Sequence, residues 1–151
     1  RLILIGAKRK FDFREPTQKR LKTLSDILEP DGAEKVLYAP SMEARLNGKY
    51  RDRPIITDPS DPLAIAPTAV AHYSKDRSTR MVVDPNGKLL DKVTGKRVRP
   101  YTIREYARLQ GFSDDFYFPD KIESYKLIGN AVSPVMGSFI ATEVKRYFAK
   151  Y

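Results

Sequence analysis

Prolines limit what the middle of this chain can form. Between residues 30 and 85 they stand at positions 30, 40, 54, 59, 62, 67 and 85. Proline lacks a backbone N–H and clashes with the preceding helical turn, so this spacing excludes long helices and favours short strands and turns. Turn signals at 84–87 (DPNG) and 94–95 (TG) predict a small antiparallel unit over residues 63–98.

The chain on either side of this region shows clearer periodicity. The apolar run LILIGA at 2–7 predicts a buried strand, and TLSDILEP at 23–30 predicts a short helix. At 101–112, YTIREYARLQGF predicts a helix in which Thr102 and Glu105 form a capping box and Gly111 is the stop. A further amphipathic helix is expected from Pro134, with Ser133 as its cap.

The composition excludes several kinds of site. The chain of 151 residues has no cysteine, which excludes disulfides, thiolate metal sites and a cysteine nucleophile within it. Its single histidine, His72, cannot form a histidine metal site alone, and no membrane-spanning run is expected. The net charge of +9 favours a polyanionic partner, nucleic acid before an acidic membrane surface. The alternative is a basic protein with no such partner.

Small residues directly before the last predicted helix suggest a binding loop. Gly129 permits close approach of the backbone, and the Asn130 amide both donates and accepts hydrogen bonds. The first turn of a helix suits a carboxylate or a phosphate. The alternative is an ordinary turn before a helix. In the preceding helix, Arg104 and Arg108 share one face, which is either a phosphate-binding surface or a solvated pair of arginines.

Two stretches, taken together, resemble a known family. RPYTIREYARLQGFSDDFYF at 99–118 and SYKLIGNAVSPVMGSFIATEV at 124–144 closely resemble the last two conserved motifs of the DNA (cytosine-5) methyltransferases. RLILIGAKR at 1–9 resembles part of an earlier motif. The resemblance implies an α/β fold: residues 1–30 and 124–151 as pieces of a Rossmann-like, S-adenosylmethionine-dependent catalytic domain, and residues 31–123 as a small, mainly β target-recognition domain with a hinge helix.

The family implies an activity and a setting. Its members transfer a methyl group from S-adenosylmethionine to C5 of cytosine in a specific double-stranded DNA sequence. The resemblance therefore implies a bacterial restriction-modification system and a cytoplasmic, nucleoid-associated protein. The target base must leave the duplex stack to be reached.

The resemblance also suggests site residues. Asn130, Ala131 and Val132 match the loop that lines the cofactor pocket, and Arg1 aligns with an arginine that contacts the cytosine O2. Arg104 and Glu105 are alternatively an internal ion pair. The residues expected at DNA, each of which could instead be merely exposed, are Thr68, Tyr73, Lys75, Arg77, Arg80 and Arg104.

The chain also departs from the family pattern. It lacks the Pro-Cys nucleophile loop, the Glu-Asn-Val acid motif and the glycine-rich cofactor loop. We therefore expect no methyl transfer by this chain alone, with the missing parts in an upstream segment or on a second polypeptide. A split enzyme and a fragment both fit this expectation. The alternative is a non-catalytic DNA-binding module derived from such an enzyme.

Overall fold

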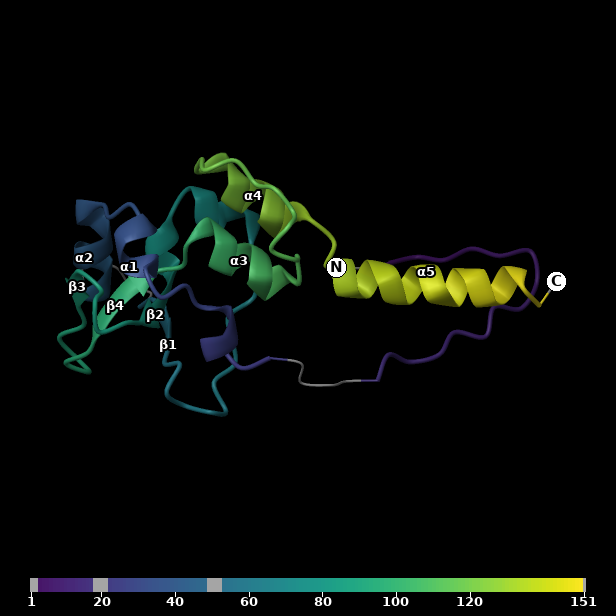
Figure 1. The fold of residues 1–151 in the computed structure, drawn as a ribbon, viewed down its shortest axis with the longest axis horizontal. Helices are drawn as coiled ribbons and strands as arrows, with labels where there is room; N and C mark the ends of the chain where they lie inside the picture. Colours follow the sequence, from purple (N-terminus) through teal and green to yellow (C-terminus); the bar gives the residue numbers. More distant parts are fainter. Residues whose placement is uncertain (1–2, 18–21, 49–52, 151) are drawn as a thin grey trace.

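The computed structural model describes residues 3–17, 22–48 and 53–150 (Figure 1). Most elements gather into one globular body that ends with α4 (Glu123–Asn130). From this body a single long helix, α5 (Pro134–Phe148), projects outward, and the N-terminal segment runs beside it.

A four-stranded sheet lies in the globular body. It comprises β1 (Ile55–Thr57), β2 (Arg80–Val83), β3 (Leu89–Leu90) and β4 (Arg97–Pro100), in the spatial order β1-β2-β4-β3. β4 pairs antiparallel with both β2 and β3, whereas β1 is parallel to β2. The antiparallel unit predicted within 63–98 is thus confirmed for β2, β3 and β4. The first part of that range, 63–70, forms a loop and not a strand.

The helices before the sheet are short, as the prolines predict. They are the 3-10 turn η1 (Ser25–Ile27), α1 (Gly32–Lys35) and α2 (Pro40–Leu46), and two further 3-10 turns, η2 (Ala71–Ser74) and η3 (Arg77–Thr79), precede β2. The helix predicted at 23–30 is therefore only one 3-10 turn. α2 starts at a proline, a position where a backbone N–H would have no partner within the helix.

The capped helix α3 (Ile103–Gln110) forms as predicted. Thr102 Oγ1 accepts a hydrogen bond from the Glu105 N–H at 3.1 Å, and Glu105 Oε2 accepts one from the Thr102 N–H at 2.8 Å. Gly111 ends the helix in the left-handed region, at φ +92°. Both ends of α3 are thus set by local sequence.

The region after α3 corrects one expectation. Gly129 and Asn130 form the last turn of α4, so the loop before α5 consists of residues 131–133 only. A Cβ on Gly129 would lie 2.3 Å from the Val70 carbonyl carbon, which explains the need for glycine where α4 crosses η2. Ser133 makes no side-chain capping bond to α5. The predicted domain boundary at residue 124 stays a prediction, although α4 packs against η2 and α3.

The predicted strand at the N-terminus is wrong for its described part. Residues 3–7 pair with no strand in the described chain, and Leu4 is 84% exposed. The segment after them lies along α5 instead, where the Phe13 ring packs edge-on against Phe139 with ring centroids 5.4 Å apart. The Arg14 N–H also donates to Glu143 Oε2 at 3.1 Å.

The expectation that no run reaches membrane length is corrected too. By length and composition alone, the stretch Glu123–Phe148 is long and apolar enough to cross a membrane. Residues 131–133 nevertheless divide it into two helices, and α4 packs into the globular body with Tyr125 and Ile128 buried.

Candidate functional site

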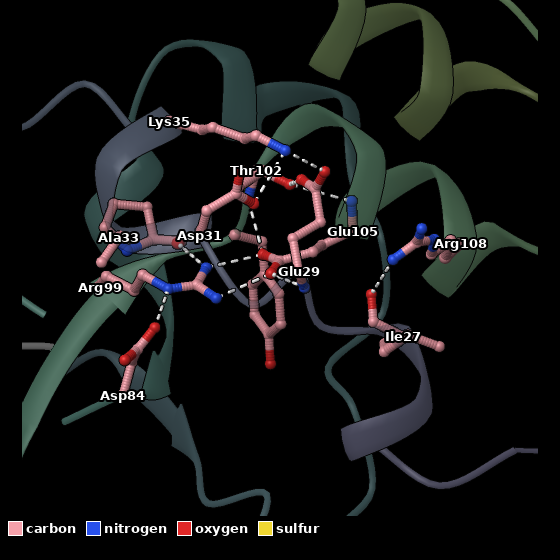
Figure 2. Close-up of polar contacts among 12 residues, drawn as sticks. Ile27, Glu29, Asp31, Ala33, Lys35, Asp84, Arg99, Thr102, Glu105 and Arg108 are labelled. Atoms are coloured by element: carbon pink, nitrogen blue, oxygen red, sulfur yellow. Dashed lines mark hydrogen bonds and ion pairs between the residues drawn. The ribbon is translucent and has the colours of Figure 1, made fainter. Parts of the chain in front are cut away.

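A buried ion pair organises the surroundings of α3 (Figure 2). The Arg99 guanidinium donates to both carboxylate oxygens of Glu105, at 2.7 Å each, and to Asp84 Oδ2 at 2.5 Å. Arg99 is 1% exposed and Glu105 is fully buried. Burial alone would lower the pKa of Arg99, but the hydrogen bonds and charge of Glu105, followed by those of Asp84, outweigh it and raise that pKa. The predicted ion pair of Arg104 with Glu105 is therefore wrong: Arg99 is the partner.

The same network ties the segment after η1 to α3 (Figure 2). Glu105 Oε1 accepts from the Glu29 N–H at 2.8 Å, and Thr102 Oγ1 donates to Glu29 Oε2 at 2.5 Å. Farther along α3, Arg108 Nη1 donates to the Ile27 carbonyl at 3.0 Å. Arg108 also pairs with Asp114 through two bonds of 2.7 and 2.8 Å. These contacts fix the position of α3 and make Arg108 a structural residue.

Two of the predicted DNA-binding arginines line one cavity, of about 290 Å³. Arg104 donates to the carbonyls of Ser113 and Phe116, at 3.3 and 3.0 Å, and Arg77 lies 3.5 Å from the Leu37 carbonyl oxygen. The complete lining is Glu29, Lys35, Leu37, Arg77, Thr102, Ile103, Arg104, Phe118, Asp120, Lys121, Ile122 and Tyr125.

The charges of this cavity favour an anion. Two lysines, Lys35 and Lys121, join the two arginines in its lining. Glu29, one of its two acidic residues, pairs with Lys35 at 2.8 Å, which leaves Arg77, Arg104 and Lys121 against Asp120 in the lining. Sequence analysis missed both lysines, since neither belongs to a motif and only the folded chain brings them to Arg77 and Arg104.

The structure places Tyr73 in the core and not at a DNA-binding surface. Its side chain is fully buried and stacks on Tyr106 with ring centroids 4.6 Å apart. Its hydroxyl donates to the Arg80 carbonyl at 2.9 Å and accepts from the Tyr101 N–H at 3.0 Å. Burial raises the pKa of Tyr73 well above its ordinary value. The apolar ring and satisfied hydroxyl make this residue a core element.

The other predicted DNA contacts lie on loops around η2 and η3. Thr68 and Lys75 are exposed, before and after η2. Arg80, the first residue of β2, is partly buried, and its guanidinium lies 3.3 Å from Thr79 Oγ1. Arg1 lies outside the described residues. His72 is exposed, and no group of His, Asp and Glu suited to a metal ion occurs within the described ranges.

The predicted cofactor loop joins α4 to α5. Asn130 is exposed at the end of α4, and Val132 is 49% exposed. Between them, the Ala131 carbonyl accepts a hydrogen bond from Gln110 Nε2 at 2.9 Å. The loop is therefore open to a ligand at Asn130 and Val132 and held by α3 at Ala131. Gln110 lies in the matched motif, but its spacing gave no indication of this contact.

A comparison with protein families identifies the family of the chain. Residues 5–146 match the sequence model of the C-5 cytosine-specific DNA methylases. The chain belongs to this family. It is 38% identical over 79 residues to the type II methyltransferase M.Bpa9945I of Bacillus paralicheniformis, and 35% identical over 66 residues to M.MthTI of Methanothermobacter thermautotrophicus. These matches cover 52% and 42% of this chain, but only 16% and 20% of the relatives.

Two solved structures confirm the α/β fold of this C-5 cytosine methylase chain. The S. pombe Dnmt2 methyltransferase aligns with a TM-score of 0.63 and 17% identity, over 87% of this chain and 44% of that one. The Entamoeba histolytica methyltransferase EhMeth aligns with a TM-score of 0.59 and 19% identity, over 92% and 44%. The chain thus spans less than half of each solved relative and a smaller share of the curated ones.

Proposed function

We propose that this chain provides the target-recognition region and one wall of the cofactor pocket of a DNA (cytosine-5) methyltransferase. Its substrate would be a specific sequence in double-stranded DNA, within a restriction-modification system in the cytoplasm, near the nucleoid. The observation that carries the proposal is the convergence of Arg77, Arg104 and Lys121 on one cavity, in a chain that belongs to the family. Guanidinium and ammonium groups together suit a phosphate of the DNA backbone.

The loop between α4 and α5 fits one end of S-adenosylmethionine. The exposed Asn130 amide can donate to the cofactor's carboxylate or accept from its ammonium group. Val132 offers a half-exposed apolar side chain beside it. When bound, S-adenosylmethionine supplies the methyl group. In this account Asn130, Ala131 and Val132 bind and orient it.

The nucleophile and the acid lie outside this chain. No cysteine is present to add to C6 of the cytosine. We propose that the Pro-Cys and Glu-Asn-Val motifs and the glycine-rich loop lie on the rest of the same protein or on a second polypeptide. This chain would then hold the DNA and complete the cofactor pocket.

Transfer of tritium from labelled S-adenosylmethionine to duplex DNA tests this function. We expect no transfer by this chain alone, and transfer when it is combined with a polypeptide that carries the missing motifs. Transfer by the chain alone would contradict the proposal. A well-folded combination that binds DNA but transfers no methyl group would support the non-catalytic DNA-binding module.

The phosphate cavity has its own test in the completed enzyme. Arg77→Ala and Lys121→Ala should each weaken DNA binding across sequences and reduce the dependence of log K on log salt by about one. Lys126→Ala is the matched control, because Lys126 is exposed on α4 and does not line the cavity. If the two cavity variants kept the wild-type salt dependence, the cavity would not be a phosphate site.

A further inference from the structure

The last residue of α3 is hydrogen-bonded to the loop that precedes α5. Gln110 Nε2 lies 2.9 Å from the Ala131 carbonyl oxygen and 3.4 Å from that of Ile128. One amide group therefore holds both the open end of α4 and the first residue of the loop. The Ile128 carbonyl also accepts from the Ala131 N–H at 3.1 Å, and the Gln110 side chain adds a second donor at this helix end, which stabilises one loop conformation.

The residue after Gln110 also packs against this junction. At the left-handed Gly111, a Cβ would lie 3.1 Å from Val135 Cγ2 and 3.3 Å from Ser133 Oγ. The backbone that ends α3 is thus within van der Waals reach of the start of α5. A displacement of α3 would be passed to the loop through both the hydrogen bonds and this contact.

The opposite end of α3 is joined to the cavity. Thr102, Ile103 and Arg104 line it, and the ion pair of Glu105 with Arg99 holds this end in the core. Because α3 has only eight residues, the residues that line the cavity at its first turn and Gln110 at its last lie about 12 Å apart on one continuous helix. An anion in the cavity would therefore contact the N-terminal end of α3, and residues 130–132 lie at its C-terminal end.

We propose that Gln110 is a positioning residue that couples DNA binding at the cavity to cofactor binding at residues 130–132, where α4 ends and the loop begins. This inference rests on the proposed function. A phosphate bound near Arg104 further stabilises the observed position of α3, in which Gln110 bonds Ala131, and this bond presents Asn130 and Val132 to the cofactor. Since coupling between two binding sites is reciprocal, the cofactor strengthens DNA binding by the same factor.

The test compares Gln110→Met with Gln110→Lys. Methionine keeps the length of the side chain but cannot donate, so both hydrogen bonds are lost. Lysine can donate to the same carbonyls, and a cation is favourable there because α3 and α4 both present their C-terminal ends. Lys126→Met is the control, since Lys126 is exposed on α4. The first measurement is hydrogen exchange of the amides at 131–137 in this chain.

The second measurement is the Kd of S-adenosylmethionine for the completed enzyme, with and without cognate duplex DNA. The ratio of these two constants measures the coupling. For Gln110→Met we expect faster exchange at 131–137, an affinity about tenfold weaker with DNA present, and a ratio that approaches one. Gln110→Lys and Lys126→Met should keep the wild-type ratio.

Three results would overturn the inference. Unchanged exchange in Gln110→Met would show that the contact does not hold the loop. Faster exchange with the wild-type ratio retained would make Gln110 merely structural. A wild-type enzyme that binds no S-adenosylmethionine would overturn the proposed function itself, and the coupling with it, which separates that failure from the other two.

Discussion

Replacing Glu105 with glutamine should destabilise the globular body strongly. Each carboxylate oxygen of Glu105 accepts two hydrogen bonds: Oε1 from Arg99 and the Glu29 N–H, Oε2 from Arg99 and the Thr102 N–H. In Glu105→Gln the new NH₂ group faces two donors whichever way the amide turns. Two hydrogen bonds are lost, and the buried guanidinium of Arg99 loses the carboxylate that accepts from both of its terminal nitrogens.

The magnitude follows from the contacts that remain. Removing one partner of a buried ion pair costs about 3–5 kcal/mol. Because Asp84 still faces Arg99 Nε at 2.5 Å, we expect the lower end of this range. For a chain of this size, a loss of about 3 kcal/mol lowers Tm by 6–12 °C. Thermal and urea unfolding of the full chain, monitored by circular dichroism, would measure this loss of stability.

An exposed ion pair provides the matched control. Asp114 pairs with Arg108, but its side chain is 62% exposed. Asp114→Asn makes the same chemical change and should cost less than about 1 kcal/mol. Equal losses in Glu105→Gln and Asp114→Asn would show that burial does not make the pair of Arg99 with Glu105 more stabilising than an exposed pair.

Three further predictions concern other parts of the structure. Gly129→Ala should cost about 1–3 kcal/mol in urea unfolding, because its Cβ meets backbone 2.3 Å away, whereas Gly137→Ala, in open space on α5, should be neutral or stabilising; equal effects would contradict the close approach. Hydrogen bonds from Lys96, and then from Ser60, lower the pKa of Asp58 to about 2. The ionised Asp58 carboxylate should therefore stabilise the fold fully above pH 4 and lose this contribution as the pH falls towards 2. In acid titrations of stability, Asp58→Asn should remove this loss. Asn130→Asp should weaken S-adenosylmethionine binding to the completed enzyme, since like charges repel, and unchanged affinity measured by calorimetry would remove Asn130 from the site.

Elements set by local chemistry could be predicted from the sequence. The capping box at Thr102 and the glycine stop at Gly111 involve residues a few positions apart, so their pattern alone fixes α3. The prolines likewise act on their own neighbours. The motifs at 99–118 and 124–144 indicate the family, and the match over residues 5–146 confirms it.

Features that depend on distant residues could not be predicted. An apolar run such as LILIGA is compatible with a strand, but a strand also needs a paired neighbour, and the described chain offers residues 3–7 none. Tyrosine is a residue type that can contact nucleic acid, yet the ring of Tyr73 packs against Tyr106 and Tyr125 in the core. The pair of Arg99 with Glu105 could not be predicted, because Arg99 reaches Glu105 from β4, through the fold and not through helical spacing.

The identity of the methylated nucleoside tests most directly whether this chain takes part in methylation of cytosine at C5. Duplex DNA treated with the completed enzyme and S-adenosylmethionine would be digested to nucleosides and analysed by mass spectrometry. We expect 5-methyldeoxycytidine, formed only when this chain is present with the polypeptide that carries the missing motifs. A product methylated on an exocyclic amine, or 5-methyldeoxycytidine formed equally well without this chain, would contradict this expectation.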